Sequence, residues 1–149
     1  MYKRQGPEIY EQLSGNIDAF VMGIGTGGTI AGVGRFLREK LGERVKIVGV
    51  VPRNSPIVGG VESDRIEGLA IDIVPEIWKR NKDLIDEIVE VSYRDALETM
   101  KKLIKYEGIL GGLSAGANVY AALKVAEKLG EGVVVTIIPD MVLRYSHLI

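Results

Sequence analysis

The sequence predicts an α/β domain of three layers, with a mostly parallel sheet between helices on both faces. Short apolar runs alternate with stretches of helical periodicity, which is the pattern of buried parallel strands joined by crossover helices. A glycine-rich turn connects the first apolar run to a helical stretch. The length of 149 residues and the apolar fraction of 46% fit one domain, residues 1–149.

The first third of the chain predicts a helix, a strand, a second helix and a second strand. Residues 7–14 are predicted as a short helix, because Pro7 suits the first helical position. Residues 18–24 are almost all apolar, as in a strand buried on both faces. Residues 29–40 place their apolar side chains on one helical stripe before Gly42, and residues 45–51 form the second apolar run.

The middle of the chain is less regular. Residues 53–68 are rich in glycine, proline and polar side chains without periodicity, and we expect this long loop to border a ligand. Residues 75–79 predict a helical turn and residues 87–91 a strand. Ser92 then resembles the N-cap of a helix, in a capping box with Asp95 in place of the usual glutamate.

The last third completes the alternation. The helix that begins after Ser92 is predicted to continue to Gly108. Residues 109–110 are predicted to form a short strand. The alanine-rich residues 114–129 predict a closely packed helix. Residues 133–138 are apolar or β-branched and predict the last strand, and residues 140–149 a terminal segment with helical character.

Composition narrows the functional classes. The net charge is −1, from 19 basic and 20 acidic residues, so we expect no nucleic-acid partner and no attraction to an anionic membrane. No apolar run approaches the ~18 residues of a membrane span, and the first residues lack the apolar region of a signal peptide. Cysteine is absent, which excludes disulfides and thiolate metal sites. A cytoplasmic location is expected, with no bound metal.

The stretch from Gly23 to Thr29 is the strongest chemical signal. It contains four glycines in seven positions, between a predicted buried strand and a predicted helix. A strand, a glycine turn and a helix start bring several backbone N–H groups and a positive dipole end to one point. Glycine lets the main chain approach a ligand closely, and the threonines add hydroxyl donors. The turn predicts an anion site, most often for a phosphate, although a tight turn without a ligand is the alternative.

Two enzyme classes are indicated by glycine motifs: a dinucleotide-binding enzyme by this turn, and a hydrolase by a second motif at residues 112–116. Gly23, Gly25 and Gly28 satisfy the G-x-G-x-x-G pattern of dinucleotide sites. The acidic residue expected after the second strand is absent, and Arg53 stands there instead. Arg53 could hold the 2′-phosphate of NADP, although a solvated loop arginine is the commoner case. Residues 112–116 match the G-x-S-x-G pattern of a hydrolase nucleophile around Ser114.

The hydrolase interpretation depends on residues near the end of the chain. Asp140 and His147 follow Ser114 in the chain order of hydrolase triads. His147 is the single histidine of the chain, and it stands two residues from the C-terminus. A surface position on a fraying end is the commoner role for such a residue. A nucleophilic triad is therefore the weaker interpretation of Ser114.

A third interpretation accounts for both glycine sites. Residues 25–34 resemble the phosphate loop of pyridoxal-phosphate enzymes of the cysteine synthase and cystathionine β-synthase family, which belong to fold type II. The resemblance runs nearly end to end, because four further motifs follow in the family's order and spacing. They are residues 6–9, 107–110, 114–117 and 139–140.

The resemblance implies a cofactor site for pyridoxal 5′-phosphate. The residues that it assigns to the cofactor phosphate are Gly25, Thr26, Gly27, Gly28 and Thr29. It also implies that the Ser114 hydroxyl meets the pyridine nitrogen and that residues 59–70 lie at the mouth of the pocket. A hydroxyl partner leaves that nitrogen largely unprotonated, which suits β-elimination and replacement. In the family, serine or an activated serine such as O-acetylserine or O-phosphoserine exchanges its β-substituent for sulfide or a thiol.

The resemblance covers only the C-terminal half of the family chain. The other half carries the Schiff-base lysine and the loop that holds the substrate carboxylate, and no lysine here stands in a matching motif. We therefore expect a truncated or split enzyme that is inactive alone and retains the cofactor weakly, or a non-catalytic remnant that binds a partner or an anion. Self-association as a homodimer or larger oligomer is expected, through residues 7–14 or a strand edge, because apolar surface that met the other half would need cover.

Two departures leave the subfamily open. Met141 follows Pro139 and Asp140, where the family usually carries serine. Residues 68–75 lack glycines that cysteine synthases tend to have, and Asp72 resembles the cystathionine β-synthase pattern. Both branches of the family stay possible parents.

Overall fold

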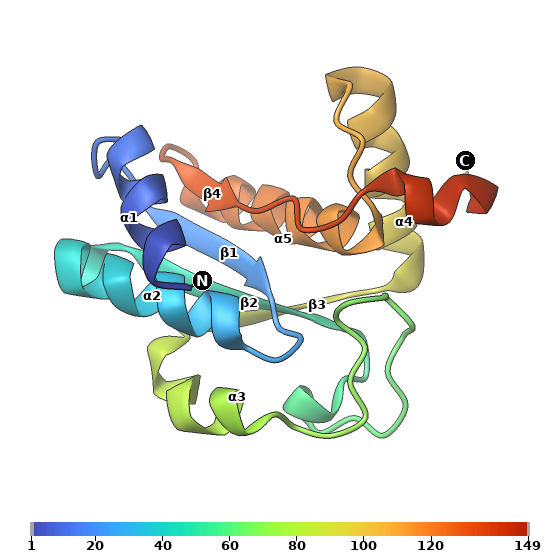
Figure 1. The fold of residues 1–149 in the computed structure, drawn as a ribbon, viewed down its shortest axis with the longest axis horizontal. Helices are drawn as coiled ribbons and strands as arrows, with labels where there is room; N and C mark the ends of the chain where they lie inside the picture. The colour runs from blue at the N-terminus through green and yellow to red at the C-terminus, as the bar shows by residue number, and fades with distance from the viewer. Residues whose placement is uncertain (1, 149) are drawn as a thin grey trace.

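The computed structural model describes the backbone of residues 2–148 and the side chains of residues 4–145 and 148. In this part of the chain, four strands form one sheet in which every pairing is parallel. Their order across the sheet is β3-β2-β1-β4 (Figure 1). The strands are β1 (Ala19–Gly23), β2 (Lys46–Pro52), β3 (Glu87–Val91) and β4 (Val134–Thr136). The predicted α/β class is confirmed.

Helices cover both faces of the sheet, as the sequence predicts (Figure 1). The helices are α1 (Tyr2–Gln12), α2 (Gly28–Leu41), α3 (Glu76–Asn81), α4 (Tyr93–Lys102) and α5 (Leu113–Leu129). Short 3₁₀ turns span Gly42–Arg44, Pro56–Val58, Lys82–Leu84 and Val142–Leu148, and one π-helical turn spans Leu103–Glu107. Among the described residues, no helix is long and apolar enough to cross a bilayer.

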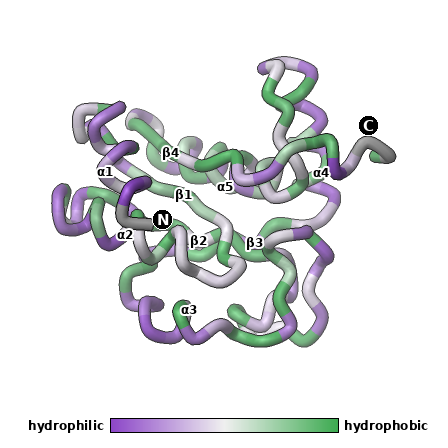
Figure 2. Tube along the Cα trace, in the orientation of Figure 1, coloured by the Kyte–Doolittle hydropathy of each residue, from purple (hydrophilic) through white to green (hydrophobic). Residues whose placement is uncertain are grey.

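The core has two halves, one on each side of the sheet. Phe20 faces α1 and α2, and its neighbour Val21 faces α4 and α5, because successive side chains of a strand alternate between faces. All five residues of β1 are buried. Figure 2 shows the hydropathy of each residue along the chain, with hydrophobic residues along β4 and hydrophilic residues on the outer turns of α1. The continuous apolar run of β1 reflects burial on both faces.

The strand order creates a crevice beside β1. The chain proceeds from β1 to β2 and β3 on one side of the sheet, and β4 lies on the other side of β1. In open parallel sheets, ligands bind at the carboxyl ends of the strands where the order reverses in this way. Here that point lies between the turn after β1 and the segment after β4.

The capping prediction at Ser92 is confirmed. Its hydroxyl oxygen accepts a hydrogen bond from the backbone nitrogen of Asp95 at 3.1 Å, which satisfies one free N–H group of α4. The Asp95 carboxylate accepts from the Ser92 hydroxyl at 2.5 Å, instead of reaching the backbone as a full capping box does. The helix therefore starts where the sequence places it.

Three boundaries differ from the prediction. The first helix begins at Tyr2, so Pro7 lies inside it and not at its start. Residues 109–110 form no strand; the neighbouring Gly111 makes only an isolated antiparallel bridge to Met141. The last strand is limited to Val134–Thr136, which pair with Ala19 to Val21 of β1.

Candidate binding site at the carboxyl ends of β1 and β4

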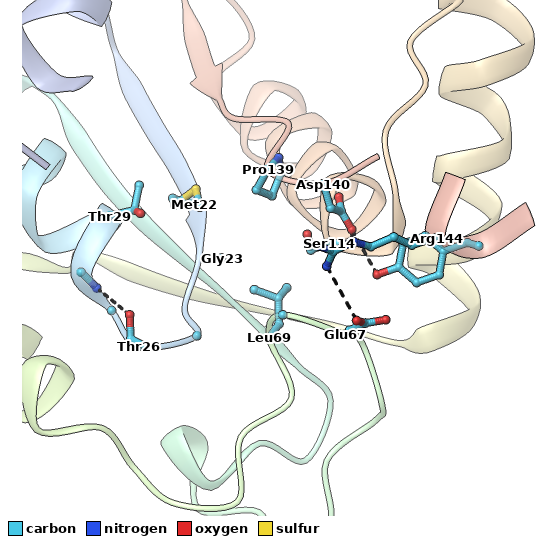
Figure 3. Close-up of a pocket in the computed structure, with 15 residues that line it drawn as sticks. Met22, Gly23, Thr26, Thr29, Glu67, Leu69, Ser114, Pro139, Asp140 and Arg144 are labelled. Atoms are coloured by element: carbon cyan, nitrogen blue, oxygen red, sulfur yellow. Dashed lines mark hydrogen bonds and ion pairs between the residues drawn. The ribbon is translucent and has the colours of Figure 1, made fainter. Parts of the chain in front are cut away.

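A cavity of about 350 Å³ opens at the point where the strand order reverses. Four segments line it: the end of β1 with the glycine turn, the loop before α3, the first turn of α5, and the segment after β4 (Figure 3). The lining residues include Gly25, Thr26, Gly27, Gly28, Thr29, Gly68, Ser114 and Asp140. All six cofactor-site residues predicted from the sequence therefore lie around one cavity.

The glycine turn forms one wall as a cradle of main chain. Gly27 has a φ of 84°, which favours glycine, and α2 begins at the next residue. The Thr26 hydroxyl oxygen accepts from the backbone nitrogen of Gly28 at 3.4 Å. The first N–H groups of a helix have no partner within it, so the start of α2 presents donors and a positive dipole end to the cavity.

The loop before α3 closes this cradle from the other side. A Cβ atom on Gly25 would lie 2.5 Å from the carbonyl oxygen of Gly68, so the two backbones are in close contact. Glu67, Gly68 and Leu69 all line the cavity. The expectation that residues 59–70 border the pocket is confirmed for these three.

Ser114 lies on the opposite wall, in the first turn of α5 (Figure 3). Its side chain is buried at 4% exposure, yet it lines the cavity. Among the described residues, no hydrogen bond holds its hydroxyl group, whereas its backbone nitrogen donates to Asp140. The Ser114 hydroxyl is therefore available to a ligand.

Asp140 caps α5 from a distance of 25 residues or more along the chain. Its Oδ1 accepts from the backbone nitrogens of Gly112 at 3.2 Å and Ala115 at 3.0 Å, and its Oδ2 accepts from Ser114 at 3.1 Å. A carboxylate here satisfies free N–H groups and offsets the positive end of the helix. Sequence reasoning missed this role, because no local pattern joins residue 140 to residues 112–115.

Tyr145 completes the wall next to Asp140. Its hydroxyl donates to Asp140 Oδ2 at 3.3 Å, and its side chain is buried. Burial raises the pKa of the Tyr145 phenol above its usual value of 10, and the nearby carboxylates of Asp140 and Glu67 raise it further. The phenol is neutral at physiological pH and acts as a hydrogen-bond donor. Arg144 forms a long ion pair with Glu67, at 4.0 Å, across the cavity rim (Figure 3).

The structure also bears on the two alternative motifs. Arg53 is exposed and is not among the residues that line the cavity, so it does not face the glycine turn as a holder of a 2′-phosphate would. Asp140 uses both carboxylate oxygens to cap α5, which leaves the proposed triad without its orienting acid. The side chain of His147 lies outside the described residues. Neither alternative gains support from the geometry.

The residues around the cavity fit a phosphorylated aromatic cofactor. The main-chain cradle at α2 suits a phosphate, and the free Ser114 hydroxyl offers one polar contact on the far wall. No lysine lines the cavity in the part of the chain that the structure describes. A covalent amine anchor for a carbonyl cofactor is therefore missing from these walls.

Comparison with known proteins agrees with this geometry. The family model described as "Pyridoxal-phosphate dependent enzyme" matches residues 1–140. Cysteine synthase B of Campylobacter jejuni is 45% identical over 145 residues, which are 96% of this chain and 47% of that protein. The O-acetylserine dependent cystathionine beta-synthase of Bacillus subtilis is 42% identical over 97% of this chain and 47% of its own length.

Solved structures share the fold over the same extent. The crystal structure of cysteine synthase from Entamoeba histolytica superposes with a TM-score of 0.90 and 35% identity, over 99% of this chain and 44% of that one. The O-acetylserine dependent cystathionine beta-synthase of Helicobacter pylori gives a TM-score of 0.89 and 38% identity, over 98% and 47%. The chain spans about half the length of the relatives it matches. With its fold, its cavity and its sequence in agreement, the chain belongs to the pyridoxal-phosphate-dependent enzyme family.

Proposed function

We propose that residues 1–149 form the cofactor-binding half of a cysteine synthase-like enzyme, whose reaction replaces the β-substituent of O-acetylserine or O-phosphoserine with sulfide. The observation that carries this proposal is the single cavity into which the start of α2 and the Ser114 hydroxyl both open. The same cavity lies at the carboxyl ends of parallel strands, where this class of sheet binds ligands.

The phosphate of pyridoxal 5′-phosphate is assigned to the glycine turn. Gly25, Gly27 and Gly28 let the backbone approach it, and Thr26 and Thr29 supply hydroxyl donors. The N-cap residue of α2 is Gly27, which has no side chain to cap the helix, and only the N–H of Gly28 has a side-chain partner, Thr26 at 3.4 Å. The next N–H groups of the first turn are free for an anion. The N-terminus of α5 is occupied by the carboxylate of Asp140, which repels a second anion. The phosphate should therefore bind at α2 and the ring should extend toward α5.

Ser114 is assigned to the pyridine ring. Its hydroxyl lies across the cavity from the glycine turn and has no other partner among the described residues. The residue after Asp140 is Met141, whose side chain is 56% exposed and does not line the cavity. The segment after β4 thus adds no hydroxyl at that position, and Ser114 remains to orient the ring. When bound, the cofactor supplies the electron sink that β-replacement requires.

The anchoring lysine is assigned to a segment outside residues 1–149. The relatives are about twice as long as this chain, and no described lysine lines the cavity. Residues 1–149 would then correspond to the C-terminal half of the family chain. By themselves they should hold the cofactor only through the phosphate, stacking and Ser114, and should not complete the reaction.

Cofactor binding is tested first, on the chain as it exists. Pyridoxal 5′-phosphate should bind weakly and reversibly, and about tenfold more tightly than pyridoxal, because only the phosphate reaches α2. Fluorescence titration measures both affinities. Thr26→Ala should weaken the phosphorylated ligand alone, whereas Ser114→Ala should weaken both. Equal affinities for the two ligands would contradict the phosphate assignment.

Activity is tested next with O-acetylserine and sulfide. The chain should be inactive alone and should gain cysteine synthesis when the unmatched half of Campylobacter jejuni cysteine synthase B is added. Replacing sulfide with homocysteine tests the cystathionine β-synthase branch of the family. The similar proteins of Bacillus subtilis and Helicobacter pylori carry that name. Cofactor binding without rescue by any half would favour the second candidate, a non-catalytic remnant.

A further inference from the structure

Asn118 is a buried polar side chain that the assigned cofactor contacts do not use. It lies on α5 with none of its surface exposed, and its Nδ2 donates to the backbone carbonyl of Ile137 at 2.9 Å. Ile137 directly follows β4, where the pairing of β4 with β1 has ended. A reversed amide would place two oxygen atoms against each other, so the bond to Ile137 fixes which way the Asn118 side chain points.

The oxygen of this amide is left without a partner. Asn118 Oδ1 is fully buried and accepts no hydrogen bond from any residue that the structure describes. Leaving a buried acceptor unpaired is unfavourable, so such an atom usually marks the place of an ordered water or of a ligand group. The nitrogen of the same amide lies 3.7 Å from the Met22 sulfur, and Met22 lines the cavity.

Asn118 Oδ1 lies directly behind the cavity wall, at the end of β1. It is 3.0 Å from the point that a Cβ atom on Gly23 would occupy, and the Leu69 side chain lies against the same point. Gly23 and Leu69 both line the cavity (Figure 3). Gly23 has no part in the phosphate assignment, and here its missing side chain leaves room beside the unpaired oxygen.

Ser114 stands one helical turn before Asn118 on α5. Residues four apart on a helix have Cβ atoms about 5–6 Å from each other on the same face. The Ser114 hydroxyl oxygen lies 3.9 Å from the Cβ position of Gly68, so it faces the same loop that Asn118 Oδ1 approaches at Leu69. One water spans a gap of this size, because two hydrogen bonds of about 2.8 Å cover about 5.6 Å end to end.

We propose that Asn118 is a positioning residue, which holds one buried water against the Ser114 hydroxyl. Its effect on the cofactor rests on the proposed function, whereas the water itself does not. The water donates one hydrogen to Asn118 Oδ1, which is an acceptor only, and the other hydrogen to Ser114 Oγ. The hydrogen of the Ser114 hydroxyl is then directed into the cavity.

This arrangement makes the cavity selective for an acceptor in front of Ser114. When a ligand offers an acceptor, such as a neutral pyridine nitrogen, the Ser114 hydroxyl donates to it and both hydrogens of the water have partners. When a ligand offers a donor, Ser114 must donate to the water, and one hydrogen of the buried water is left without a partner among these groups. Asn118 thereby favours an unprotonated ring nitrogen.

A purely structural role is the alternative for Asn118. Its Nδ2 alone ties α5 to the segment after β4 through Ile137. If this were its whole role, replacing Asn118 would weaken every ligand contact to the same degree. The proposal instead predicts the loss of one contact, the one between Ser114 and the ring nitrogen.

The water is tested first, in the chain without any ligand. A high-resolution crystal structure should show one ordered water within about 3.2 Å of both Asn118 Oδ1 and Ser114 Oγ. Asn118→Leu keeps the branched shape without the acceptor, and its structure should lack this water. A structure of the original chain without the water would overturn the proposal, and so would a water that persists in the variant. This result does not depend on cofactor binding.

The direction of the Ser114 hydroxyl is tested with two ligands that differ only at the ring nitrogen. The first, 4-deoxypyridoxine 5′-phosphate, has no aldehyde and therefore reports non-covalent binding. The second carries a CH group in place of the ring nitrogen and cannot accept from Ser114. By calorimetry, Asn118→Leu should lower the affinity of the first ligand relative to the second about fivefold, the effect of one ordinary hydrogen bond. The preference for phosphorylated over unphosphorylated ligand should stay, because α2 is intact.

Thr136→Val is the matched control. Thr136 Oγ1 donates to the Val21 carbonyl at 2.7 Å, so this variant also removes a side-chain hydrogen bond at the junction of β1 and β4. Thr136 does not line the cavity, and the affinity ratio should change by less than about twofold. In a Ser114→Ala background, Asn118→Leu should have no further effect on the ratio, because both act on one contact.

The outcomes separate this inference from the proposed function. An unchanged ratio in Asn118→Leu, or an equal fall in Thr136→Val, would contradict the positioning role of Asn118. If neither ligand binds the original chain, the proposed function fails, and the crystal structures of the original chain and of Asn118→Leu decide the inference alone.

Discussion

The carboxylate of Asp140 lies against the first turn of α5, with Oδ2 3.1 Å from the backbone nitrogen of Ser114. One helix start at the cavity is therefore neutralised by the protein's own anion, and the other, at α2, is open. The electrostatic potential in the cavity is therefore expected to be more positive at the start of α2 than at the start of α5. We expect a ligand with one anionic end to bind with that end toward the glycine turn and its neutral end toward Ser114.

Removal of the Asp140 carboxylate should destabilise the domain. Asp140→Ala leaves the N–H groups of Ser114 and Ala115 without their acceptor, whereas the N–H of Gly112 keeps the backbone carbonyl of residue 140. Loss of a helix cap costs up to about 2 kcal/mol. Urea denaturation measures this as a lower midpoint at unchanged slope. Asp140→Asn keeps one acceptor oxygen and should cost less.

The control for this prediction is Asp72→Ala. Asp72 is exposed at the wall of a second cavity, and among the described residues its side chain makes no hydrogen bond or ion pair. Its replacement should change the free energy of unfolding by less than about 0.5 kcal/mol. Equal effects at positions 72 and 140 would show that the cap does not stabilise α5.

Tyr145 should make stability depend on pH in the alkaline range. Burial and the carboxylates of Asp140 and Glu67 raise the pKa of its phenol in the folded state, whereas the unfolded chain has a tyrosine pKa near 10. The folded state therefore keeps a proton that the unfolded state releases. The stabilisation is fully present below pH ~10 and is lost as the pH rises through the folded pKa.

Tyr145→Phe should remove this part of the alkaline decline. It should cost about 1 kcal/mol near pH 8, since the hydrogen bond to Asp140 is lost, and flatten the fall of unfolding free energy above pH ~10. Denaturation series at several pH values measure both effects. Tyr106→Phe, at a side chain that is 68% exposed, should leave the profile unchanged. Identical profiles for both variants and the original chain would contradict the assignment.

Local patterns predicted the parts of the fold that depend on neighbouring residues. The apolar run of residues 18–24 contains β1, and the glycine turn and the Ser92 cap lie where the sequence places them. The six predicted site residues line one cavity, because a turn after β1 and the start of α5 both lie at the carboxyl end of a parallel sheet. Their role toward the cofactor stays a prediction.

Features set by tertiary contacts were not predictable in this way. Residues 2–6 lack apolar periodicity, so the start of α1 before Pro7 is not visible in the sequence; packing of Ile9, Tyr10 and Leu13 against the core supports a helix that tolerates the proline. Ile109 and Leu110 are apolar but find no strand partner, because the segment after β4 offers only the bridge at Met141. The cap at Asp140 joins residues far apart in the chain.

Gly25→Ala should disrupt the binding cavity more than the fold. The new Cβ would lie 2.5 Å from the Gly68 carbonyl oxygen, so the glycine turn and the loop at residues 67–69 must separate. We expect a cost of about 1–3 kcal/mol and loss of measurable pyridoxal 5′-phosphate binding, by denaturation and fluorescence titration. Gly108→Ala is the control: its φ is 67° with open space around it, so it should cost about 1–2 kcal/mol and leave binding unchanged.

Gly116→Ala tests the packing that holds Ser114 in place. A Cβ at Gly116 would lie 2.1 Å from the backbone carbonyl oxygen of Ala96, so α4 and α5 must move apart. Alanine favours a helix over glycine by about 1 kcal/mol, but overpacking against a backbone atom should exceed this gain and give a net loss of about 3 kcal/mol. Thermal and urea denaturation measure the loss. Leu123→Ala, on an exposed part of α5, should cost about 0.5 kcal/mol or less. A Gly116→Ala protein as stable as the original would mean that the helices separate freely, and that the first turn of α5 is not held rigidly at the cavity.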